Sequence, residues 1–354
     1  MGQKFNFKFN KELLNKGFYT ASYFLKASKL VNKYKPNELV CMQFTHFSKE
    51  PVMVCGIQES IELLKTCLPK NVLKNIEIYG RQDGDLVKPK SPILLIFGKY
   101  QDFGKFENVI DGILARRSSV ANNCYQMLRL IKTNQLIYMA DRTDDYLVQP
   151  YDGYAAYIGG IRNFVTDASV SLLNDKSDVK VTGTIPHALI QEFDGKLNDV
   201  MKVYASEYGR KGLIALIDYH NDVKRDIIDI SKDFPDTFAV RIDTSKSVCD
   251  VSLKKIPKNY GVSDELIKFT RKTLDQVGMK KTRIIVSSGI DLERVKEIKG
   301  RNLPVDFYGV GGSLITRNVH ITADLVLKNN RHQAKFGRKL FININKKKSL
   351  KKYV

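Results

Sequence analysis

The segment GTIPH places a threonine near the end of a predicted strand and a histidine just after it. The predicted strand 178–185 ends with Thr184 and Ile185, and His187 opens the helix-like segment that follows. An imidazole has an unperturbed pKa of about 6.5, so near neutral pH it can be an uncharged nucleophile. A histidine that caps a helix or packs against one is nevertheless the commoner finding in such a position. The motif by itself therefore leaves both a structural and a catalytic role open.

Charged side chains end several other predicted strands. Asp218, Asp222 and Asp243 lie on or just beyond adjacent strands, and Arg142 and Arg241 stand in equivalent positions. Carboxylates placed there can bind ribose hydroxyls or a Mg²⁺ ion that holds a diphosphate. Arginine is the bidentate partner of carboxylates and phosphates. Helix caps, turns and surface ion pairs are the structural alternatives, and a cap fits Asp222 best.

Two glycine-containing loops follow the last two predicted strands. The first contains Ser288 and Gly289, and the second contains Gly311 and Gly312. Exposed backbone N–H groups at the start of a helix bind anions, and the late strands of βα barrels often hold a phosphate. The two loops together predict a phosphate-binding site.

The elements that carry these residues alternate between strand and helix. Strands are predicted at 135–142, 178–185, 213–220, 238–245, 283–290 and 306–314, and helices at 263–277 and 291–299. Ser263 and Asp291 are the expected N-caps, and Gly278 and Gly300 are the expected ends. Repeated βα units imply a parallel sheet, and their number favours a closed barrel. The site is then expected at the carboxyl ends of the strands.

The first hundred residues have a different pattern. A helix is predicted at 18–31, and a buried strand at 93–97 follows turn signals at Asp83-Gly84 and Ser91-Pro92. We therefore predict an α/β chain with an N-terminal α+β domain at 1–112, completed by 325–354, and a βα barrel domain at 113–324.

The composition is that of an ordinary globular chain of 354 residues. Hydrophobic residues make up 43% and charged residues 27%, which excludes wholesale disorder. The longest apolar runs, such as 93–97, are far below the roughly 20 residues of a membrane-spanning helix. The first ten residues lack the apolar core of a secretory signal. We expect a soluble, cytoplasmic protein that does not bind membranes.

The cysteines and the net charge limit the choice of partners. The five cysteines form no C-x-x-C pair, which excludes the usual zinc spacing and argues against a disulfide framework. Lysine and arginine exceed acidic residues by 58 to 38, a net charge of +20. Such a surplus suits nucleic acid, an anionic membrane or phosphorylated small molecules as partners, but the lysines are spread along the chain, as coding bias would place them. We expect no specific nucleic-acid site, and the lysine-rich segment 346–352 is expected to be a solvated terminus.

Taken in order, these segments resemble the nicotinate phosphoribosyltransferase family, the type II phosphoribosyltransferases that share a barrel with quinolinate phosphoribosyltransferase. The resemblance covers nearly the whole chain, and GTIPHA is its most specific block. The matching blocks are GFYTASYF, ENVIDGILARRSSVANN, ADR followed by AAYIGG, GTIPHALI, ALIDYHND, AVRIDTS, VSSGID, YGVGGSL and ITADLVLKNNRHQAKFGR.

The resemblance implies a reaction and a set of roles. Nicotinate and 5-phosphoribosyl 1-diphosphate (PRPP) would give nicotinate mononucleotide and diphosphate, with ATP hydrolysed alongside and Mg²⁺ bound to the phosphates. His187 would be phosphorylated by ATP. The remaining roles implied are nicotinate binding by Tyr19, Thr184 and Arg241, substrate-anion or PRPP binding by Arg142, Asp218 and Asp243, and PRPP-phosphate binding by Ser288, Gly289, Gly311 and Gly312. Family members are homodimers in which the N-terminal domain of one subunit covers the barrel mouth of the other.

Two other functions are weighed against this one. A sister enzyme on the same barrel would use nicotinamide or quinolinate, but quinolinate needs extra basic groups for its second carboxylate and has no use for a phosphorylated histidine. A basic nucleic-acid-binding protein would bind in a strongly salt-dependent way, and no motif for nucleic-acid binding is found.

Overall fold

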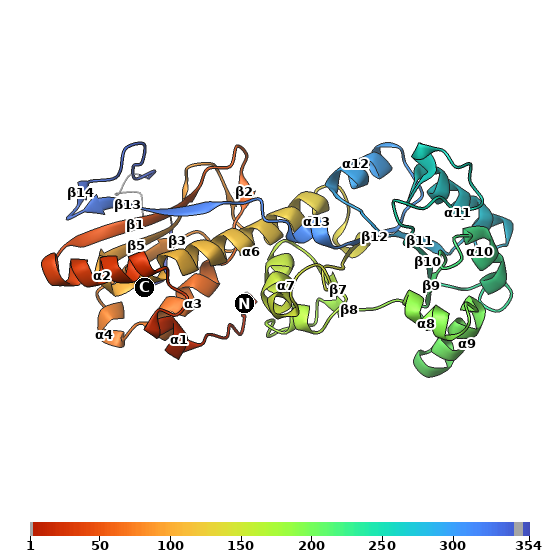
Figure 1. Ribbon diagram of the computed structural model, residues 1–354, viewed down its shortest axis with the longest axis horizontal. Helices are drawn as coiled ribbons and strands as arrows, with labels where there is room; N and C mark the ends of the chain where they lie inside the picture. Colours follow the sequence, from red (N-terminus) through yellow and green to blue (C-terminus); the bar gives the residue numbers. More distant parts are fainter. Residues whose placement is uncertain (1–2, 343–349) are drawn as a thin grey trace.

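The computed structural model describes residues 3–342 and 350–354, and it has two parts joined by one long helix (Figure 1). The helix, α6 (Glu107–Leu128), links an antiparallel six-stranded sheet to a parallel seven-stranded sheet. Within the described residues, no helix is both long and apolar enough to cross a membrane. Most of the predicted lysine-rich terminus, 346–352, lies outside the described residues.

The N-terminal part is built on the antiparallel sheet, with strand order β14-β13-β1-β5-β3-β15. The predicted strand at 93–97 is the centre of β5, and the predicted helix at 18–31 begins and ends slightly later, as α2. β13 pairs with β1, so the chain returns from the second part to complete this sheet. The bounds are α1 (Lys11–Lys16), α2 (Ser22–Tyr34), β1 (Leu39–His46), β2 (Val52–Met53), α3 (Ile57–Cys67), α4 (Lys70–Leu73), β3 (Glu77–Gly80), β4 (Leu86–Val87), β5 (Pro92–Lys99), α5 (Tyr100–Phe103), β13 (Ile321–Lys328), β14 (Arg331–His332) and β15 (Lys351–Lys352).

The second part is an open barrel whose strands run in the order β8-β7-β6-β12-β11-β10-β9, all parallel to their neighbours. All six predicted strands are present in shortened form, and the two-residue strand β7 was not predicted. The expected closure of the barrel is wrong, because no pairing joins β8 to β9 in the described chain. β8 is only two residues long and exposed, so it offers no second edge to pair. The strands are β6 (Leu136–Tyr138), β7 (Asn163–Phe164), β8 (Lys180–Val181), β9 (Ile214–Leu216), β10 (Ala239–Ile242), β11 (Arg283–Val286) and β12 (Phe307–Val310).

The helices of the barrel begin where the sequence places their caps. The side chains of Ser263, Asp291 and Asp222 accept hydrogen bonds from backbone N–H groups three residues on. Gly278 follows α11 with φ of +87°, the left-handed conformation that glycine adopts without strain. The bounds are α7 (Gln149–Ile158), α8 (His187–Glu192), α9 (Leu197–Tyr208), α10 (Val223–Ser231), α11 (Asp264–Gln276), α12 (Leu292–Gly300) and α13 (Gly312–Ile315).

Helix α6 takes part in both hydrophobic cores. Ile110 and Leu114 pack into the core of the N-terminal part, whereas Val120 and Cys124 pack into the core of the barrel. The predicted domain boundary between residues 112 and 113 therefore lies inside a continuous helix. All five cysteines are buried.

Two glycines in helices provide a test of this packing. A Cβ at Gly153 of α7 would lie 1.9 Å from the carbonyl oxygen of Ser169, whereas a Cβ at Gly112 of α6 would meet nothing within 4 Å. We expect Gly153→Ala to destabilise the protein by about 1–3 kcal/mol, because the backbone must move to admit the methyl group. Gly112→Ala should be neutral or stabilising by up to about 1 kcal/mol, because alanine favours the helix. Urea unfolding of both variants checks this, and equal midpoints would contradict the packing described.

Candidate active site

The carboxyl ends of the parallel strands surround a pocket of about 990 Å³. Its wall comes from the loops after β6, β8, β10, β11 and β12, as expected for a barrel of this kind. Nine of the predicted site residues line it: Arg142, Thr184, His187, Arg241, Asp243, Ser288, Gly289, Gly311 and Gly312.

His187 is paired with Asp218, the tenth predicted residue. His187 begins α8, and its Nε2 lies 3.2 Å from the Oδ1 of Asp218, which follows β9. The hydrogen bond that His187 donates to Asp218 raises the pKa of His187, against the opposing effect of burial. Because a carboxylate accepts, Nε2 carries the hydrogen, and the lone pair is left on Nδ1. The imidazole is thus oriented, and 44% of its side chain remains exposed to reactants.

Arg241 lies in β10, and its guanidinium is only partly hydrogen-bonded by the described residues. Its Nη1 donates to the Oγ1 of Thr184 at 2.6 Å, and its Nη2 lies 3.4 Å from Asp243. Its Nε is buried and has no hydrogen-bond partner among the described residues. Burial lowers the pKa of the guanidinium, and the neighbouring carboxylates Asp243 and Asp218 oppose this effect. A buried donor without an acceptor is costly, so the site suits a ligand that brings a carboxylate or phosphate oxygen.

The two glycine loops need glycine for different reasons. Ser288 and Gly289 both have φ of +67°, and a Cβ at Gly289 would lie 2.4 Å from the Cε of Lys246. A Cβ at Gly311 would lie 2.7 Å from the carbonyl oxygen of Met139. The second loop therefore packs directly on the loop after β6.

Lys246 is a pocket residue that the sequence analysis missed. It lines the pocket in the loop after β10, and its side chain occupies the space that Gly289 leaves free. Its position, one residue beyond the predicted strand at 238–245, is the sequence feature that could have identified Lys246 as a pocket residue. The apolar lining, which includes Ile137, Val165 and Ile214, was also not identified, because these residues read as ordinary strand positions.

Tyr19 is not brought to the pocket of its own chain. It lies between α1 and α2 and is not among the residues that line the pocket. In Figure 1 these two helices belong to the N-terminal part, whereas α8 and α10 lie on the other side of the long helix α6. The backbone carbonyl of Tyr19 accepts a hydrogen bond from Asn108, its ring packs on Phe18, and the residue is 50% exposed.

Sequence comparisons relate the chain to phosphoribosyltransferases. Residues 30–118 match the family model of the quinolinate phosphoribosyl transferase N-terminal domain. A nicotinate phosphoribosyltransferase of Mycobacterium tuberculosis is 26% identical over 254 residues, 71% of this chain and 53% of that protein. A nicotinate phosphoribosyltransferase of Bacillus subtilis is 24% identical over 245 residues, 67% of this chain and 45% of that protein. The chain thus spans about half the length of these relatives.

Solved structures share the fold. The nicotinate-nucleotide pyrophosphorylase of Pyrococcus furiosus superposes with a TM-score of 0.78 at 26% identity, over 94% of this chain and 81% of that one. The human nicotinic acid phosphoribosyltransferase superposes with a TM-score of 0.66 at 13% identity, over 89% of this chain and 76% of that one, a likeness of fold alone.

The His187–Asp218 pair predicts a pH response. We expect Asp218→Asn to lower the pKa of His187, because the variant removes the negative charge that favours the imidazolium and leaves only a neutral amide oxygen as acceptor. NMR titration of the imidazole measures this directly. Since the folded-state pKa of His187 is raised, the pair stabilises the fold at low pH and its contribution is lost as the pH rises through that pKa. The difference in the free energy of unfolding between the parent and Asp218→Asn should therefore become smaller as the pH rises through the pKa of His187.

Asp222→Asn is the matched control, because Asp222 caps α10 through the Arg225 N–H and asparagine can do the same. An unchanged His187 pKa in Asp218→Asn would contradict the pairing.

Proposed function

We propose that the chain is a nicotinate phosphoribosyltransferase, which joins nicotinate to PRPP to form nicotinate mononucleotide and diphosphate in NAD biosynthesis; its similarity to the two nicotinate phosphoribosyltransferases supports this. The observation that carries this proposal is the convergence of the motif residues on one pocket, where Arg241 keeps an unpaired buried donor beside an apolar lining.

The pocket suits a flat aromatic carboxylate. Ile137, Val165 and Ile214 supply an apolar surface for a pyridine ring. Arg241 supplies a guanidinium whose orientation is fixed by Thr184. We propose that this guanidinium binds the nicotinate carboxylate, which would satisfy its unpaired Nε.

The rest of the pocket suits PRPP. Arg142 and Lys246 bring positive charge, and the loops at Ser288-Gly289 and Gly311-Gly312 bring backbone N–H groups. Transfer at the anomeric carbon passes through a cationic, oxocarbenium-like state in which the substrate nitrogen is the nucleophile. The protein therefore acts mainly by holding the substrates in line and by stabilising the departing diphosphate.

Mg²⁺ fits this site as an ion carried by the substrate phosphates. Magnesium is usually held by one or two carboxylates together with substrate phosphates and water. Asp243 offers such a carboxylate on the pocket wall, held in place by the hydroxyl of Ser287 at 2.7 Å. Magnesium would supply positive charge to the leaving diphosphate.

We further propose that ATP phosphorylates His187. Asp218 holds the Nε2–H, so Nδ1 is the nitrogen with a free lone pair. Its attack on the terminal phosphorus of ATP would form an N–P bond while the P–O bond to ADP breaks. Hydrolysis of the phosphohistidine would then return the imidazole and release phosphate.

A homodimer would explain the position of Tyr19. Helix α2 has no buried residue in the single chain, and Phe18, Tyr19, Tyr23, Leu30 and Tyr34 are exposed on it or just before it. Apolar surface of this kind typically marks an interaction site. We propose that it covers the barrel mouth of a second copy and places Tyr19 against the nicotinate ring there.

Quinolinate is the second candidate substrate, because the matching family model is that of the quinolinate enzyme. It carries two carboxylates and therefore needs more basic groups. The lysine and arginine side chains lining the pocket within the described residues are Arg142, Arg241 and Lys246, and a phosphate and a diphosphate also need partners. Because three basic side chains must serve all of these anionic groups, the pocket favours a substrate with one carboxylate.

The test is mononucleotide formation from nicotinate, PRPP and Mg²⁺, with and without ATP, alongside nicotinamide and quinolinate. We expect product from nicotinate, stimulated by ATP. His187→Ala should abolish ATP hydrolysis linked to turnover yet retain some transfer at high PRPP, because the transfer step itself does not use the imidazole.

His332→Ala is the matched control, since His332 lies exposed on β14 in the N-terminal part. Equal ATP hydrolysis in His187→Ala and the parent would refute the phosphohistidine. Product from quinolinate instead of nicotinate would replace the proposed substrate.

The dimer predicts complementation between two defective variants. Tyr19→Ala should raise the KM for nicotinate far more than that for PRPP, because only the ring contact is lost. Mixing Tyr19→Ala with His187→Ala subunits should restore ATP-stimulated activity at low nicotinate to about a quarter of the parent level, because half the dimers then contain one intact site. Absence of recovery after verified subunit exchange would place both residues in the same chain's site and contradict the shared site.

A further inference from the structure

We propose that Arg116 is a positioning residue that holds two loops of the pocket in fixed relation, the loop carrying Arg142 and the loop carrying Gly311-Gly312. The inference rests on the proposed function, because it assumes that these loops bind the phosphate groups of PRPP. Arg116 itself is outside the pocket, on the middle of α6.

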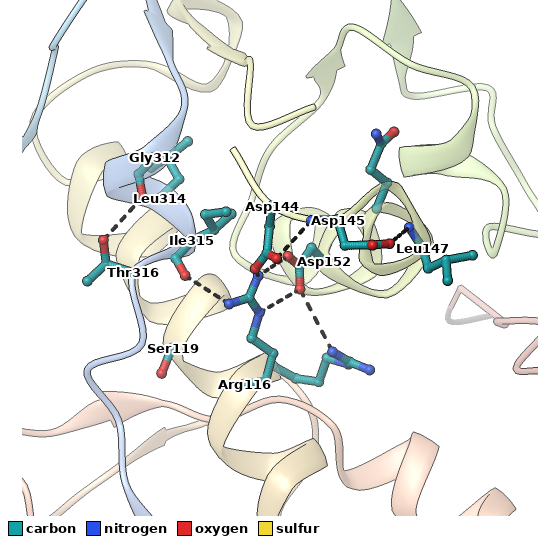
Figure 2. Close-up of polar contacts among 12 residues, drawn as sticks. Arg116, Ser119, Asp144, Asp145, Leu147, Asp152, Gly312, Leu314, Ile315 and Thr316 are labelled. Atoms are coloured by element: carbon teal, nitrogen blue, oxygen red, sulfur yellow. Dashed lines mark hydrogen bonds and ion pairs between the residues drawn. The ribbon is translucent and has the colours of Figure 1, made fainter. Parts of the chain in front are cut away.

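The guanidinium is anchored by a buried carboxylate. Its Nε donates to the Oδ1 of Asp152 at 3.0 Å and its Nη2 to the Oδ2 at 2.5 Å, a bidentate pair (Figure 2). The side chain of Asp152, on α7, is only 3% exposed. The plane of the guanidinium is therefore fixed by the core, and the direction of its remaining donors is fixed with it.

The first remaining contact reaches the loop after β6. Nη2 also donates to the Oδ2 of Asp144 at 3.0 Å, and the Oδ1 of Asp144 accepts from the N–H of Asp145 at 2.8 Å (Figure 2). Asp144 is two residues from Arg142, which lines the pocket together with Thr143. This ion pair therefore ties an otherwise exposed loop to the interior.

The second remaining contact reaches the loop after β12. Nη1 donates to the carbonyl oxygen of Ile315 at 3.3 Å, at the end of the short helix α13 that begins at Gly312 (Figure 2). The hydroxyl of Thr316 in turn donates to the carbonyl of Gly312 at 3.1 Å. The guanidinium of Arg116 thus contacts both loops.

The two loops also meet at the pocket wall. A Cβ at Gly312 would lie 3.2 Å from the Cγ2 of Thr143, and a Cβ at Gly311 would lie 3.5 Å from its Oγ1. A shift of the Asp144 loop would therefore move Arg142 relative to the backbone N–H groups of the second loop. Because anion binding depends on donors converging at the right distance, such a shift should weaken it.

Asp144 provides a sharper test than Arg116. Removing Arg116 would take both hydrogen bonds of the bidentate pair from the buried carboxylate of Asp152 and leave it only Arg117, whose Nη1 lies 3.8 Å away, so the variant is expected to destabilise the whole protein. Asp144→Asn keeps the acceptor for the Asp145 N–H but loses the charge that faces Arg116. Asp145→Asn is the matched control, because Asp145 accepts from the N–H of Leu147 in the same loop and has no contact with Arg116 in the described structure.

The experiment measures binding of inorganic diphosphate with Mg²⁺ by calorimetry, and the KM values for PRPP and nicotinate. We expect Asp144→Asn to weaken diphosphate binding and raise the KM for PRPP by about five- to tenfold, while the KM for nicotinate and the melting temperature stay near the parent values. Asp145→Asn should leave all four unchanged. Equal diphosphate affinity in Asp144→Asn and the parent would overturn the inference.

A double-mutant cycle distinguishes the positioning of Arg142 from a general loss of order in the pocket loops. In an Arg142→Gln background, Asp144→Asn should have little further effect on diphosphate binding, because the group that it positions is gone. Full additivity of the two substitutions would overturn the inference. A parent protein that does not bind diphosphate would instead refute the proposed function, and the inference with it.

Discussion

The buried carboxylate of Asp152 must be surrounded by positive charge, and this requirement organises the junction between the two parts of the molecule. Arg116 and Arg117, adjacent on α6, both approach it, and Arg117 also forms a bidentate pair with the buried Glu59 of α3 at 2.8 and 3.1 Å. Because unpaired buried charges are so costly, α3, α6 and α7 are fixed relative to one another. The pocket loops that contact Arg116 are therefore held in place relative to these three helices.

The parallel sheet supplies the second constraint. Parallel strands end at one edge, so residues far apart in the sequence converge there: Thr184 on Arg241, His187 on Asp218, and Asp243 on Ser287. Each of these pairs joins the ends of different βα units. The open side of the barrel, between β8 and β9, coincides with the segment that carries the GTIPH motif.

Much of the local structure could be predicted because it depends on short-range chemistry. Ser263, Asp222 and Asp291 cap helices through hydrogen bonds to residues three positions on, and apolar runs such as 93–97 form buried strands. Two-residue strands such as β7 and the failure of the barrel to close were not predictable in this way. They depend on which strand edges pair with each other, and the residue pattern of a single segment does not indicate its pairing partner.

The sequence by itself determined the order of the βα units, the chemistry at their ends and the family resemblance, because these follow from residue types and near neighbours. Only the tertiary structure decided that Lys246 fills the space beside Gly289, that Arg116 contacts Asp144 and the Ile315 carbonyl, and that Tyr19 lies away from its own pocket. Such contacts are set by how helices pack on the sheet, which is a cooperative property of the whole core.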